Sequence, residues 1–109
     1  MTDYLKKSLS ALKRIEGKIL SIAIQDTYKG ANKIAAQCYR NLHKVGENLR
    51  YIDDQADWNK VDCESSRLHA LVQSQINLGG AHRDRVDFAR ARELRDEYRE
   101  SQSKHWLNQ

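Results

Sequence analysis

Proline is absent from this 109-residue sequence, which also holds only five glycines, one methionine and one phenylalanine. Without proline the chain offers no polyproline linker and no proline-punctuated loop. Long apolar runs are missing as well, since no stretch approaches the roughly 18 apolar residues that a membrane-spanning helix needs. The length is that of one domain. We therefore expect a single small domain without a transmembrane segment.

The start of the chain offers no apolar stretch of the kind found in a secretory signal. Its single leucines alternate with basic side chains, namely Lys6, Lys7, Lys13 and Arg14. Cysteine is scarce too: Cys38 and Cys63 are 25 residues apart, a spacing that fits neither a redox pair nor half of a zinc site. We expect a cytoplasmic protein in which both thiols are free, with Cys38 buried and Cys63 the more exposed.

Apolar residues recur at steps of three and four, the period of an amphipathic helix. The first stripe is Leu5, Leu9, Leu12, Ile15, Ile19 and Ile22. The second is Ile34, Cys38, Leu42, Val45, Leu49 and Ile52, and the third is Trp58, Val61, Ser65, Leu68, Val72 and Ile76. These patterns predict an all-α fold, an antiparallel bundle of three long helices.

The expected helices span about residues 3–28, 31–52 and 57–78, and a polar fourth helix spans about 82–104, all within one domain. Thr2 or Asp3 is expected to cap the first helix, Gly30 to end it in a left-handed conformation, and Asp57 to cap the third. Gly79-Gly80 predicts a flexible joint before the fourth helix. Three thin apolar seams of this kind are commonly completed by a second chain, so we expect a homodimer.

The fourth predicted helix carries the most distinctive pattern. One ridge at steps of three and four consists of Arg85, Phe88, Arg92, Arg95, Arg99, Gln102 and Trp106. Guanidinium groups pair with carboxylates or phosphates, and aromatic rings anchor interfaces. The ridge could instead pack beside the acidic turn of Asp53, Asp54 and Asp57, or against a dimer mate. Residues 83–100 hold six arginines and six acids, which is unusual for a helix devoted to DNA.

Basic charge is concentrated in the first half of the chain. The formal net charge is +4, whereas residues 1–50 hold ten basic and four acidic side chains. On the first helix the basic side chains lie opposite the apolar stripe: Lys6, Lys7, Lys13, Arg14 and Lys18. Such a face is usually only solvated, but it could also contact nucleic acid.

The sequence holds no pattern typical of an enzyme. It lacks a nucleophile elbow and a glycine-rich phosphate loop, and its four histidines have no metal-ligand spacing. We expect no catalytic residue, no cofactor and no metal. The favoured hypothesis is a small non-enzymatic accessory or regulatory protein that binds a protein partner through helical faces, with contact residues Arg85, Phe88, Arg92, Arg95, Arg99 and Trp106. The alternatives are a nucleic-acid-binding protein and, less favoured, an inhibitor encoded by a virus or mobile element.

Overall fold

The structure is a computed structural model that describes residues 3–107, with side chains described up to residue 104. Its elements are α1 (Tyr4–Leu20), α2 (Tyr28–Asn48), the short 3-10 helix η1 (Leu49–Tyr51), α3 (Gln55–Leu78) and α4 (Gly80–Leu107). Helices account for nearly all of this part of the chain, and no strand occurs in it. The predicted all-α bundle is confirmed.

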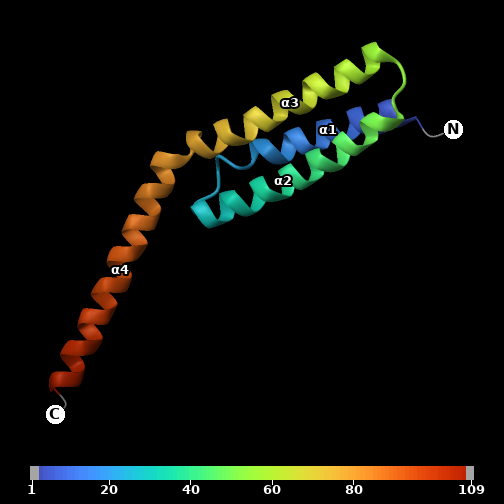
Figure 1. The fold of residues 1–109 in the computed structure, drawn as a ribbon. Coiled ribbons are helices and arrows are strands. Elements are labelled where there is room, and N and C mark those ends of the chain that lie inside the picture. The colour runs from blue at the N-terminus through green and yellow to red at the C-terminus, as the bar shows by residue number, and fades with distance from the viewer. Residues whose placement is uncertain (1–2, 108–109) are drawn as a thin grey trace.

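The first three helices lie side by side and antiparallel, and α4 leaves the bundle at the end of α3 (Figure 1). The three predicted stripes meet in one core. Its members are Leu12, Ile15, Ile19, Ile22, Ala31, Ala35, Cys38, Leu42, Val45, Val61, Leu68 and Val72. The apolar stripes of the three helices therefore pack against one another within one chain. The homodimer stays a prediction.

The first helix ends earlier than the sequence predicts. α1 stops at Leu20 instead of near residue 28. The main-chain N–H groups of Ser21, Ile22 and Gln25 then donate to the carbonyls three residues earlier, which are turns and no longer α-helical bonds. Ile22 remains fully buried, so the apolar stripe continues past the helix end and made the helix look longer. Gly30 is not a left-handed cap: it lies in the first turn of α2, where its N–H donates to the Thr27 side chain.

The connection between α2 and α3 also differs in detail. α2 gives way to η1 after Asn48, close to the predicted end near residue 52. The third helix begins at Gln55, two residues before the expected start, because Asp54 and not Asp57 accepts the N–H of the first turn. At the start of the chain, Asp3 caps α1 as predicted by accepting the Lys6 N–H.

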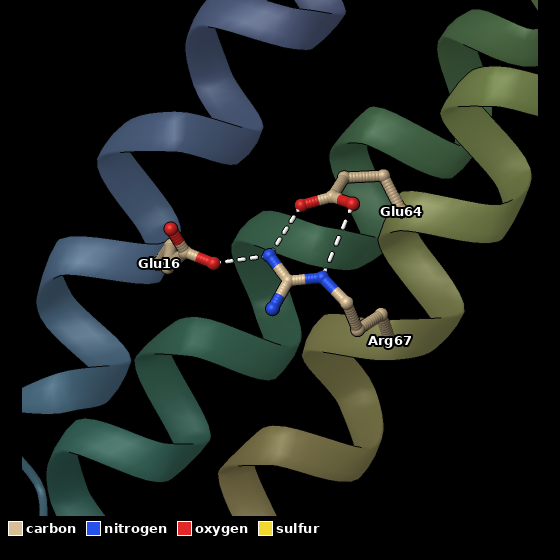
Figure 2. A network of polar contacts seen from close by, with 3 residues as sticks. All are labelled: Glu16, Glu64 and Arg67. Atoms are coloured by element: carbon tan, nitrogen blue, oxygen red, sulfur yellow. Dashed lines mark hydrogen bonds and ion pairs between the residues drawn. The ribbon is translucent and has the colours of Figure 1, made fainter.

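A polar bridge fastens α1 to α3 on the outside of the bundle (Figure 2). Arg67 of α3 donates from Nε and one Nη to both carboxylate oxygens of Glu64, and the same Nη pairs with Glu16 of α1. The hydrogen bonds from Arg67 lower the pKa of Glu64 below its ordinary value. The contact links two helices through exposed side chains, and such a surface ion pair adds only a little to the stability that the packing of their apolar faces gives.

The outline of the molecule is long and thin, with principal extents of 78 × 24 × 15 Å. Its radius of gyration is 21.8 Å, whereas a compact domain of this length has one of about 13 Å. The difference comes from α4, which runs away from the bundle as a single rod (Figure 1). Within residues 3–107 no helix is apolar enough over a sufficient length to cross a bilayer.

Candidate functional site

The joint between α3 and α4 is a packed elbow, which differs from the flexible joint that the sequence predicts. Gly79 ends α3 and Gly80 begins α4, and neither has a positive φ. A Cβ on Gly79 would lie 2.5 Å from the Ala23 carbonyl oxygen and 2.7 Å from Nη2 of Arg83. Glycine is needed here because main chain and guanidinium approach too closely for any side chain.

Arg83 holds this elbow together and is fully buried. Its Nε donates to the Gln25 carbonyl at 3.1 Å, and its two Nη atoms donate to the carbonyls of Ile76 and Ile22. These carbonyls belong to the end of α3 and to the turns after α1, where helical partners are missing. One guanidinium thus satisfies main-chain acceptors from two segments and ties the first turn of α4 to both.

Tyr28 and His82 complete the elbow from either side of the joint. The Tyr28 hydroxyl donates to the Gly80 carbonyl at 3.1 Å, and the Arg83 guanidinium lies over the Tyr28 ring, 5.6 Å from its centroid. Burial and the neighbouring Asp84 carboxylate raise the pKa of Tyr28. His82 reaches Asp26 at 3.4 Å. The direction in which α4 leaves the bundle is therefore fixed by specific contacts.

Beyond the elbow, α4 has almost no cover from the rest of the chain. From residue 84 to residue 104 every side chain is exposed except that of Val86, which is half-buried. The arginines of the predicted ridge, Arg85, Arg92, Arg95 and Arg99, all lie on this exposed rod. Phe88 is 63% exposed, and Arg92 packs over its ring at 4.9 Å. The side chain of Trp106 lies outside the described side chains.

The ridge does not pack beside the acidic turn of its own chain, which was one of the two packings weighed from sequence. Asp53, Asp54 and Asp57 lie at the junction of η1 and α3, and α4 begins at the opposite end of α3 (Figure 1). The 24 residues of α3 separate the two by about 36 Å. That packing is therefore ruled out.

The polar face of α1 divides into two groups. Lys7, Arg14 and Lys18 line a groove between α1 and α2, where Lys44 of α2 joins them. Lys13 is not among the lining residues, and Lys6 borders a shallower depression next to it. A helical wheel places all five basic residues opposite the apolar stripe, but it could not show which of them α2 would face. Lys44 was missed because nothing in the sequence connects it with α1.

The remaining candidate chemistry is sparse. Cys38 is buried, and burial raises the pKa of its thiol, whereas Cys63 is exposed, as predicted. In the part of the chain that the structure describes, no three potential ligands gather into a metal site. The surface features that remain are the exposed rod α4 and the basic groove.

Comparison with known proteins adds nothing to these features. No protein-family model, no curated protein and no solved structure matches the chain.

Proposed function

We propose that this is a non-enzymatic accessory protein of the cytoplasm that binds a second protein along α4. The observation that carries the proposal is the lack of intramolecular cover over residues 84–104. The bundle of α1, α2 and α3 acts as a base, and the Arg83 elbow holds α4 away from it. Two free cysteines agree with a reducing compartment.

The low intrinsic stability of a helix without packing partners supports this role for α4. An isolated helix is marginal in water, and most helices gain their stability from packing an apolar face. Local ion pairs such as Arg90 with Glu93 at 3.1 Å and Lys104 with Glu100 at 3.6 Å supply part of what packing would give. Each such pair contributes only about 0.3–0.5 kcal/mol. A partner that covers α4 would stabilise it further.

The chemistry of the ridge indicates an acidic protein surface as the occupant. Its four arginines offer planar forks that match carboxylates, and Phe88 supplies an apolar anchor among them. Glu93, Glu97 and Glu100 lie on another side of the helix, whereas Asp96 contacts Arg95 of the ridge at 3.6 Å. We infer a partner with a carboxylate-rich helical face.

A second copy of the chain would offer a carboxylate-rich helical face of this kind. The anionic side of α4 consists of Glu93, Asp96, Glu97 and Glu100 and could face the arginine ridge of a mate. Light scattering after size exclusion separates the two cases: a mass of 12.7 kDa means that the partner is a different protein, and a doubled mass means a homodimer.

The test compares a ridge variant with a variant of equal charge. Arg92→Gln/Arg99→Gln neutralises two ridge arginines, and Arg40→Gln/Arg50→Gln neutralises two exposed arginines of α2 and η1. Affinity for the stoichiometric partner, or for the second copy, should fall about tenfold or more in the ridge variant only. Equal loss in both variants, or binding that neither changes, would contradict the proposal.

A further inference from the structure

The groove between α1 and α2 is a second basic surface, separate from α4. It has a volume of about 520 Å³ and is open to solvent along one side. Four cationic side chains line it, Lys7, Arg14 and Lys18 from α1 and Lys44 from α2, with the amides of Asn41 and Asn48 between them. Two helices thus bring together charges that are up to 37 residues apart in sequence.

These four cations are not neutralised within the protein. Among residues 3–104, none of them lies within 4.0 Å of a carboxylate oxygen. Glu47 is the carboxylate that also borders the groove, and it contacts His43 at 3.4 Å. The groove thus carries four cationic side chains and one carboxylate, and a concave surface whose charge is mostly of one sign attracts anions. The groove therefore has an excess of positive charge that the fold itself does not use.

The lining does not suit a protein helix or an apolar ligand. Its large apolar members, Ile15 and Val45, are only 5% and 3% exposed, because they belong to the bundle core. A docked amphipathic helix would find no apolar pocket for its anchors. The groove therefore offers charge and hydrogen-bond donors on the aliphatic stems of its lysines and arginine, without a pocket for a large apolar anchor.

The spacing of the cations suits a polymer of regularly placed anions. On one side of α1 lie Lys7, Arg14 and Lys18, at steps of seven and four residues. This row of three side chains spans about 16 Å along the helix axis. The phosphates of one nucleic acid strand follow one another at about 3.4 Å along the duplex axis, so a row of this length lies alongside several of them. Lysine and arginine side chains are common donors to such phosphates. Among the described lining residues none is aromatic, so no base would stack there.

We propose that the α1–α2 groove binds the phosphate backbone of a nucleic acid without reading its sequence. This proposal is independent of the protein-binding role of α4 and can fail or succeed without it. Four phosphate contacts release counterions in proportion to their number. Raising the salt from about 50 mM to about 200 mM should therefore weaken binding to duplex DNA roughly 150-fold, and binding to a single strand roughly 50-fold.

Fluorescence anisotropy of the full chain with a labelled oligonucleotide of about 16 nucleotides, single-stranded or in a duplex, measures both affinity and its salt dependence. The groove variant is Lys7→Gln/Arg14→Gln. The matched control is Lys13→Gln/Lys33→Gln, which removes the same charge from exposed positions of α1 and α2 outside the groove. The α4 variant Arg92→Gln/Arg95→Gln is a second control.

The proposal predicts that the groove variant lowers the slope of log affinity against log salt by about 1.8 on a duplex and about 1.4 on a single strand, whereas both controls keep the slope of the unchanged protein. The single-strand and duplex arms show which form of the backbone is preferred. Absence of binding at about 50 mM salt overturns the proposal. So does equal loss in the Lys13/Lys33 control, loss confined to the α4 variant, or equally tight binding of a polyglutamate peptide, which would indicate a protein ligand.

Discussion

The buried guanidinium of Arg83 donates a hydrogen bond to the main-chain carbonyl of Ile22, 61 residues earlier in the chain. Ile22 is a core residue in the turn that follows α1, and Arg83 lies in the first turn of α4. The bond therefore joins the bundle to the rod. It also explains why a polar helix can leave the core in a defined direction without packing against it.

Replacing Arg83 by methionine should destabilise the protein strongly. Methionine fills a similar volume but removes the guanidinium donor from the carbonyls of Gln25, Ile76 and Ile22, of which the last keeps the Gln25 N–H as its other partner. Losing hydrogen bonds from a charged donor to buried acceptors should lower the free energy of unfolding by about 3 kcal/mol. Urea unfolding followed by circular dichroism measures the change.

The exposed neighbour Arg85 provides the control for that substitution. Arg85→Met should change the free energy of unfolding by no more than about 0.5 kcal/mol, as is usual for surface positions. Equal stability of the two variants would mean that Arg83 does not hold the elbow.

Glycine substitutions should have opposite effects at the elbow and in the helices. Gly79→Ala places a methyl group 2.5 Å from the Ala23 carbonyl oxygen and should cost about 1–3 kcal/mol through the backbone shift it forces. Gly17→Ala meets nothing within 4 Å and lies inside α1, so it should stabilise the protein by up to about 1 kcal/mol. Thermal unfolding measures the stability of both variants. A Gly79→Ala variant as stable as Gly17→Ala would contradict the close approach of residue 79 to the Ala23 carbonyl.

The two thiols should differ in reactivity in the folded protein. Cys63 is exposed and should react with a thiol reagent such as Ellman's reagent as fast as a free peptide thiol. Cys38 is in the core and burial raises its pKa, so it should react only when the bundle opens. The Cys63→Ser variant isolates the slow phase. Rapid labelling of Cys38 under native conditions would contradict the three-helix core.

The Glu64–Arg67 contact should add stability that depends on pH. Because Arg67 lowers the pKa of Glu64 in the folded protein, the contribution is full above the unfolded pKa of 4.5 and is lost as the pH falls through the lower folded value. The difference in Tm between the unchanged protein and Glu64→Gln should thus be constant from pH 7 to about pH 5 and shrink below about pH 4.

As a control, the same comparison of Tm is made in a protein that carries Arg67→Gln. Without the guanidinium, Glu64→Gln should no longer change the way Tm depends on pH. A difference that persists in the Arg67→Gln background would assign the effect to another group.

The helical bundle could be predicted because its determinants are periodic. Val61, Leu68 and Val72 recur at helical spacing and are all buried, as the pattern indicates. Helix ends were harder to place, since Ile22 keeps the period of the stripe although α1 has already stopped at Leu20. A stripe records which side chains face the core, and a turn can continue that face without continuing the helix.

The elbow and the groove depend on contacts that sequence spacing does not encode. Arg83 looks like one more arginine of a charged helix, and the only local signal of its role is that it closely follows Gly79-Gly80. Lys44 reaches the groove because α2 packs against α1 at one particular rotation. The exposed arginine ridge, by contrast, could be predicted because all its members lie on one helix.

Small-angle X-ray scattering of the monomeric chain shows whether α4 projects from the bundle uncovered. We expect a radius of gyration close to 21.8 Å and a longest dimension close to 78 Å. A radius near the value of about 13 Å for a compact domain of this length would mean that α4 folds back onto the bundle, and it would contradict the account.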